Sequence, residues 1–196
     1  MKPRLRPWAA GLIAIGCAGG GDAPALSLAT ATPTDRFWAL VENARRDGTG
    51  CERVAERLTD TLATLPSAAI TEFNEELTTR LVESYRWDLW AVAYIANGGA
   101  SDDGFDYFRG WMITRGRARF EHALRDAPSA VEGAPWLGDL ECEAVLGVAH
   151  AAYENATGQA LPRPTVPWPA SPTGEAWTEE NLEQVYPGLT ARVRRR

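Results

Sequence analysis

The chain has 196 residues, with 20 Lys or Arg and 26 Asp or Glu, and its formal net charge is −6. A chain of this length can bury a sizeable core in one domain. Its basic residues are scattered or gathered at the C-terminal end, with no basic stripe that interleaves with aromatic residues, so we do not expect nucleic acid as a partner.

The N-terminus has the three parts of a secretory leader. Three basic residues (Lys2, Arg4 and Arg6) precede a short apolar run over residues 8–15, and small residues follow. The run is too short to span a bilayer as a permanent helix. Residues 14–17 read Ala-Ile-Gly-Cys and resemble the lipobox of bacterial lipoproteins, in which the cysteine is lipidated. We therefore expect a signal peptide over residues 1–16 and a lipid anchor at Cys17.

Residues 17–33 are rich in Gly, Ala, Ser, Thr and Pro, as a flexible linker would be. This composition supports an exported protein anchored to the membrane of the cell envelope, and the lipid anchor would be its only membrane contact. Loss of the three leader charges would change the net charge from −6 to −9. The alternative is a cytoplasmic protein whose start codon has been assigned too far upstream.

Apolar residues at three- and four-residue steps predict three helices in the first part of the domain over residues 34–196. The first is capped by Thr34 or Asp35 and broken by the glycines at 48–50; the second runs from about Cys51 to Leu65. The third begins at Pro66 and continues to Tyr85. Because no alternating strand pattern competes, we predict a single compact all-α domain.

The stretch from Tyr85 to Trp111 holds eight aromatic and six charged residues. Its first half, Arg86 to Asn97, is apolar nearly all round, which is typical of a helix in the middle of a domain. Two glycines after Asn97 end this helix, and Ser101 can cap the next one. We therefore predict two helices joined by a tight glycine turn.

The second of these helices has an apolar face and a charged face. Asp102, Asp106 and Arg109 are spaced to share the charged face, and Arg109 is the nearest candidate to neutralise Asp88 in the preceding helix. In one interpretation Asp102 and Asp103 only cap the helix and Arg109 pairs with Asp88 and Asp106, whereas in the other these charges line a ligand cleft. The candidate ligand-binding residues are Trp87, Asp88, Asn97, Asp102, Asp103, Asp106 and Arg109.

Beyond residue 112 the pattern predicts a helix that continues from Ile113 to Arg125 and another over Leu137 to Thr157. The proline-rich arm, Leu161 to Trp177, cannot be a helix or a central strand. Its two tryptophans indicate that it packs against the domain, because free linkers rarely keep such residues. A last short helix is expected to begin with Thr178 as its cap and to end at Tyr186-Pro187. The arginine-rich C-terminus is interpreted as a frayed, solvated helix end and not as a binding patch.

Cysteine and histidine usage predicts no metal site. His122 and His150 lack the short spacing to each other or to cysteine that zinc sites use, and we predict no cofactor. Cys51 and Cys142 can form a disulfide if the protein is exported, and both are reduced core thiols if it is cytoplasmic.

Several motifs resemble those of the bacterial family called domain of unknown function 4240. They are Trp87-Asp88-Leu89-Trp90, Asn97-Gly98-Gly99, Ser101-Asp102-Asp103-Gly104-Phe105 and Tyr107-Phe108-Arg109-Gly110-Trp111. The resemblance covers nearly everything from Thr34 onward and implies a compact, mainly helical fold, but no activity, because none is established for the family. Its members look mostly cytoplasmic. This chain departs from their pattern in its leader, in Ala100 where cysteine is common, and in its two other cysteines.

Three functions compete on these observations. The preferred one is a tethered binding module for a small ligand or a protein, with a cleft beside Ser101 to Arg109 that favours a cation or a polar or basic peptide over an anion. The alternative is a hydrolase in which Asp88, Asp102, Asp103 and Asp106 supply general acid and base, although the chain has no nucleophile elbow, phosphate loop or His-Glu metal motif. The third is a purely structural domain.

Overall fold

The computed structural model describes residues 31–46, 50–134 and 137–195, and the regular elements in these ranges are all helices. The all-α prediction is confirmed. The expected signal peptide, the lipidation site at Cys17 and most of the expected linker lie outside the described residues.

Four helices lead into the aromatic stretch: α1 (Pro33–Ala44), α2 (Cys51–Ala63), α3 (Ser67–Glu83) and α4 (Trp87–Asn97). The first is capped two residues earlier than expected, because the Thr32 hydroxyl accepts a hydrogen bond from the Asp35 amide and the Asp35 carboxylate accepts one from the Thr32 amide. At the end of α4, Gly98 adopts the left-handed conformation that the sequence predicts there.

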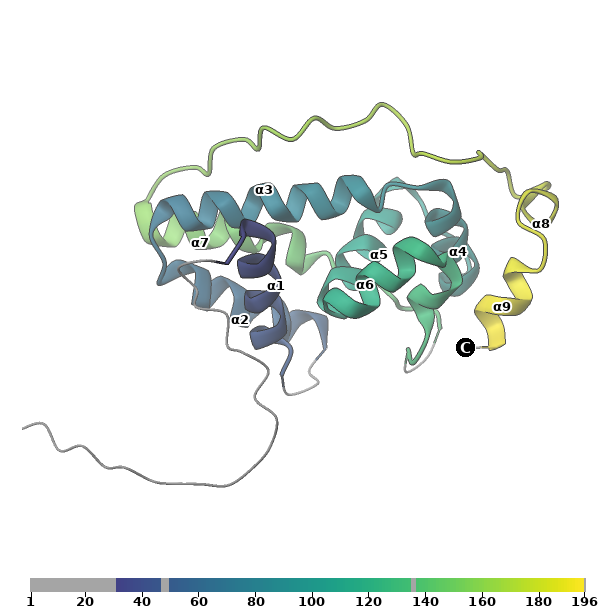
Figure 1. Cartoon of the computed structure of the whole chain (residues 1–196), viewed down its shortest axis with the longest axis horizontal. Helices are drawn as coiled ribbons and strands as arrows, with labels where there is room; N and C mark the ends of the chain where they lie inside the picture. The colour runs from purple at the N-terminus through teal and green to yellow at the C-terminus, as the bar shows by residue number, and fades with distance from the viewer. Residues whose placement is uncertain (1–30, 47–49, 135–136, 196) are drawn as a thin grey trace, which may run out of the picture. The chain divides into compact units, whose positions relative to one another are not determined.

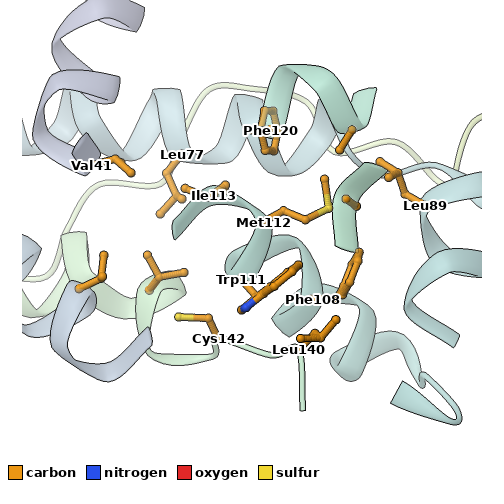
Figure 2. Close-up of a cluster of buried hydrophobic side chains, with 14 of the residues drawn as sticks. Val41, Leu77, Leu89, Phe108, Trp111, Met112, Ile113, Phe120, Leu140 and Cys142 are labelled. Atoms are coloured by element: carbon orange, nitrogen blue, oxygen red, sulfur yellow. The ribbon is translucent and has the colours of Figure 1, made fainter. Parts of the chain in front are cut away.

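The helix α5 (Asp102–Thr114) is the centre of the domain, in contact with α2, α3, α4 and α6. Its N-cap is Ser101, as predicted, and its hydroxyl accepts a hydrogen bond from the Gly104 amide. Figure 2 shows Phe108, Trp111, Met112 and Ile113 of α5 surrounded by buried side chains from several other elements. These surrounding side chains are Val41, Leu77, Leu89, Phe120, Leu140 and Cys142.

Two groups of helices flank α5 (Figure 1). On one side α1, α2 and α3 pack with one another, and α2 and α3 also pack with α7 (Val148–Thr157). On the other side α4 packs on the 3-10 helix η1 (Ala127–Val131) and on α9 (Leu189–Arg195), while α6 (Arg117–Arg125) also contacts η1. The short α8 (Leu182–Val185) precedes α9.

Three helix predictions were wrong in their bounds. The expected helix over Ile113–Arg125 is broken between α5 and α6, because Gly116 has a left-handed φ of 89°. The expected helix over Leu137–Thr157 begins only at Val148, after the 3-10 helix η2 (Ala144–Gly147). The last helix begins at Leu182 and not after Thr178, because Thr178 donates its amide to the Asn181 side chain.

The segment before η2 is held in an irregular conformation by partners outside it. The Cys142 amide donates to the Tyr107 carbonyl at 2.8 Å, and the Leu140 amide donates to Asn97 Oδ1 at 3.1 Å. Cys142 also forms a disulfide with Cys51, the pairing that the sequence left open. Because these backbone amides have hydrogen-bond acceptors outside the segment, they do not require the hydrogen bonds of a helix.

The proline-rich arm returns from the end of α7 along α3 to α8 (Figure 1). It packs against the domain, as its tryptophans predicted. Trp168 lies over Tyr85 with ring centroids 5.8 Å apart, and the Trp177 indole donates to the Trp87 carbonyl at 2.9 Å. An isolated parallel bridge joins Thr173 to Arg86.

Candidate functional site

Arg109 is the largest fully buried side chain in the described part of the domain, with 0% of its surface exposed. Its guanidinium carbon lies 4.9 Å from the ring centroids of Tyr85 and Phe105 and 5.3 Å from that of Trp168. We call this arrangement the Arg109 cage. Cations are attracted to the faces of aromatic rings, so the cage offsets part of the cost of burying the charge.

Hydrogen bonds complete the Arg109 cage. The guanidinium donates to the Leu81 carbonyl at the end of α3 and to the half-exposed Asp106 carboxylate one turn earlier in α5. Burial lowers the pKa of Arg109, and the Asp106 charge opposes this shift. Among the described residues, the Arg109 Nε atom has no hydrogen-bond partner. Arg109 thus fixes three elements to one another, namely α3, α5 and the arm.

An aromatic stack extends from the Arg109 cage to the start of α4. Phe105 stacks on Trp90 at 4.9 Å, and Trp90 stacks on Trp87 at 5.3 Å. Trp87 and Tyr94 both meet the ring of Trp177 edge to face. The candidate residue Trp87 therefore belongs to the packing between α4, α5 and the arm.

Asp88 is paired with Arg86, so the prediction that Arg109 neutralises it is wrong. Arg86 Nη2 lies 2.5 Å from Asp88 Oδ2, and Arg86 Nε donates to Oδ1 at 3.0 Å. The same guanidinium donates to the Leu124 carbonyl at 2.5 Å, which links the start of α4 to the end of α6. The predicted pairing of Arg109 with Asp106 is confirmed.

The remaining candidate residues occupy other places. Asp102 and Asp103 are exposed in the first turn of α5, where the helix dipole favours negative charge. Asn97 holds the backbone of Leu140, as described above, and its Nδ2 atom is buried without a hydrogen-bond partner among the described residues. The structure therefore does not bring the seven candidate residues into one cleft.

A groove does exist beside Asp88, and it is formed by three adjoining hollows. The first, of about 330 Å³, and the second, of about 360 Å³, share Asp88 and Tyr186 in their walls. The third, of about 380 Å³, shares Asp126, Pro128 and Arg192 with the first. We call the whole depression the Tyr186 groove.

Ion pairs and an apolar floor line the Tyr186 groove. The Arg86–Asp88 pair lies in one part, and Arg192 pairs with Asp126 at 2.6 and 2.7 Å in another. Tyr186 donates its hydroxyl to the Glu175 carbonyl at 2.7 Å. Burial is the main cause that raises the pKa of Tyr186, and the charge of Asp88 adds to it. The first hollow is also lined by Ala127, Pro128, Val185, Pro187 and Leu189.

No local pattern in the sequence indicates the C-terminal wall of the Tyr186 groove. Tyr186 and Pro187 were interpreted only as a helix end, and Arg192 as part of a solvated terminus. Almost 100 residues separate Tyr186 from Asp88 in the sequence, and the two approach only because the arm carries the chain back to α4.

A further hollow of about 610 Å³ lies beside Tyr107, Glu52 and Glu143. Burial raises the pKa of Tyr107, and the nearby charges of Glu143 and Asp103 raise it further. This hollow is the closest counterpart of the cleft expected beside Ser101 to Arg109, although of those residues it contains only Tyr107.

The described residues contain neither a cluster of metal ligands nor a membrane-spanning helix. No group of three or more His, Cys, Asp or Glu side chains in these ranges could hold a metal ion. In the same ranges, no helix combines the length and the apolar character needed to cross a membrane.

Comparison with known proteins identifies the family of this domain. No curated protein and no solved structure matches the chain. A family model described as "Protein of unknown function (DUF4240)" matches residues 33–155, which include the whole of α1 to α6 and end before the arm. Because this match covers more than half of the sequence, the chain belongs to the DUF4240 family of proteins of unknown function.

Proposed function

We propose that the protein is a binding module that holds a short polypeptide segment in the Tyr186 groove. The observation that carries this proposal is the continuity of the three hollows, which share Asp88 and Tyr186 at one junction and Asp126, Pro128 and Arg192 at the other. An extended peptide needs such a continuous depression, whereas a compact ligand needs a single deep pocket.

The lining of the Tyr186 groove supports a polypeptide ligand. Tyrosine and arginine are enriched at protein interfaces, where they combine apolar contact area with hydrogen bonding. The groove places Tyr186 next to apolar residues and sets a guanidinium group, Arg86 or Arg192, in each of its outer parts. Arg86 and Arg192 each already have a carboxylate partner, so a peptide with both charge signs would fit better than a strongly charged ligand.

Export and tethering to the envelope belong to the same proposal. The Cys51–Cys142 disulfide supports them, because disulfides persist mainly in oxidising compartments. The leader-like N-terminus and the lipobox-like Cys17 point the same way. The hydrolase alternative draws less support, because Asp88 and Asp106 each already accept hydrogen bonds from an arginine and lie in different places.

A random dodecapeptide phage library, selected on the immobilised full chain, tests the proposal. Selected peptides should bind the wild-type chain in fluorescence anisotropy and lose about tenfold in affinity, roughly 1.4 kcal/mol, when Arg192 is replaced by Gln. Arg194→Gln is the matched control, because Arg194 is exposed on the same helix and does not line any of the three hollows. Failure to select any peptide, or equal binding by both variants, would overturn the proposal.

A further inference from the structure

The proline-rich arm is seated on a surface with the properties of a peptide-recognition site. Along α3, Glu75 accepts hydrogen bonds from the Thr165 amide at 2.8 and 3.1 Å. At the junction of α3 and α4, the Thr173 amide donates to the Tyr85 carbonyl at 3.0 Å, and the Thr173 carbonyl accepts from the Trp87 amide at 2.9 Å. The domain therefore binds the backbone of the arm at two separate places, Thr165 and Thr173.

Aromatic side chains supply the rest of this surface. Trp168 of the arm covers Tyr85 and the guanidinium of Arg109. Trp177 packs against Trp87 and Tyr94 with ring centroids 6.3 and 5.2 Å away. We call Glu75, Tyr85, Trp87, Tyr94 and Arg109 the arm-binding surface. Grooves lined by aromatic residues are a recurrent way of binding proline-rich segments, which lose little entropy on binding because they are already stiff.

The family match includes the arm-binding surface but not the arm. All five residues of the arm-binding surface lie within the matched range 33–155, and the whole arm lies beyond it. The arm is also only partly buried. Trp168 is 48% exposed and is the one exposed large hydrophobic side chain among the described residues. The arm therefore resembles a bound segment more than a part of the core.

We propose that the arm-binding surface recognises an extended segment of another protein that contains proline and tryptophan, and that the chain's own arm occupies it as an intramolecular competitor. None of the five residues of the arm-binding surface lines the Tyr186 groove, although the arm supplies Thr173, Gly174 and Glu175 to one of its hollows. Binding at this surface does not require a ligand in the groove. A tethered segment acts at an effective concentration in the millimolar range, so a partner must outcompete it or bind after it has been displaced.

The test uses the full chain with its own arm weakened by Trp168→Ala and Trp177→Ala together. The probe is a fluorescein-labelled synthetic peptide with the sequence of residues 161–178. Its binding is measured by fluorescence anisotropy. The double variant should bind the peptide at least tenfold more tightly than the wild-type chain. A control peptide with alanine in place of both tryptophans should not bind, and Glu75→Gln in the double variant should weaken binding of the intact peptide.

Each outcome decides the proposal. A double variant that is folded by circular dichroism but binds the peptide no better than the wild-type chain overturns it. If the double variant does not fold, a protease site inserted after Gly158 in the full chain replaces it, because residues 158–160 are exposed. Cleavage at this site separates the arm and the C-terminal helices from the rest of the chain. Replacement of this cleaved fragment by the labelled peptide supports the proposal, and absence of replacement overturns it. A wild-type chain that forms dimers at high concentration would assign the surface to a second copy and not to a different protein.

Discussion

Gly110 lies where α5 passes close to the segment that carries Cys142. A Cβ atom at this position would lie 2.5 Å from the Cys142 carbonyl oxygen and 3.0 Å from Val145 Cγ1. The carbonyl cannot easily withdraw, because Cys142 is held by its disulfide and by its hydrogen bond to Tyr107. The absence of a side chain at Gly110 therefore sets the distance between α5 and this segment.

Replacement of Gly110 by Ala should destabilise the domain by about 2 kcal/mol, the usual range for an overpacked core. Alanine favours a helix over glycine by only about 1 kcal/mol, so the steric clash should outweigh the helix propensity. The free energy of unfolding, measured in urea, checks this. Gly104→Ala in the same helix is the control, because its added Cβ would have ordinary contacts of 3.5 Å and should be neutral or stabilising. Equal stability of the two variants would contradict the prediction.

Sequence spacing alone could not identify Arg86 as the ion-pair partner of Asp88. Arg109 was the nearest opposite charge on a predicted helix face, and Arg86 was too close in sequence to share a face with Asp88 if both were helical. In the structure Arg86 is the extended N-cap of α4, with φ −138° and ψ 141°, so its side chain turns back to Asp88. The backbone conformation at a helix end decides such pairings.

At the scale of an element, helical spacing predicted the interior of α2 to α5 well, because the apolar residues of these helices face one core. It failed for residues 137–143, where the apolar spacing also fits a helix. There the backbone donors of Leu140 and Cys142 find acceptors on Asn97 and Tyr107, and these tertiary partners replace helical hydrogen bonds. Such long-range partners have no local sequence signal.

The N-terminus of α1 gives a pH-dependent prediction. A hydrogen bond from the Thr32 side chain, and then one from Arg117, lowers the pKa of Asp35. A lowered pKa in the folded state contributes stability above the unfolded-state value, near pH 4, and this stability is lost as the pH falls through the folded-state pKa. Asp35→Asn should therefore lower the unfolding temperature at pH 7, and its difference from the wild-type chain should decrease as the pH falls below about 4.

Thermal unfolding followed by circular dichroism between pH 3 and pH 7 measures this effect. Asp60→Asn is the control, because Asp60 is exposed on α2 and does not cap a helix. A difference between Asp35→Asn and the wild-type chain that stays constant over the whole range would show that the carboxylate charge is not involved.

At the scale of the whole molecule, the arm joins parts of the chain that the sequence could not place together. Two tryptophans in a proline-rich segment were enough to predict that the arm packs on the domain. They could not show that it passes along α3, covers Arg109 and brings Tyr186 to Asp88. The candidate residues on α4 and α5 were therefore chosen from local pattern, whereas the Tyr186 groove depends on the path of the chain.

The Cys51–Cys142 disulfide also acts on the whole molecule, because it joins residues 91 positions apart. Closing a loop of this length restricts the unfolded chain, and such a bridge contributes about 2–5 kcal/mol. Its loss should also release the irregular segment before η2, which has no helix of its own. We therefore expect the reductant TCEP to lower the free energy of unfolding of the wild-type chain by about 2–5 kcal/mol in urea.

The double variant Cys51→Ala and Cys142→Ala separates the bridge from other effects of the reductant. Its stability should be close to that of the reduced wild-type chain and should not respond to TCEP. A wild-type chain that is equally stable with and without TCEP would contradict the prediction. A loss of about 2–5 kcal/mol is a large part of the usual stability of about 5–15 kcal/mol, so the predicted loss on reduction would also favour the exported protein over the cytoplasmic alternative.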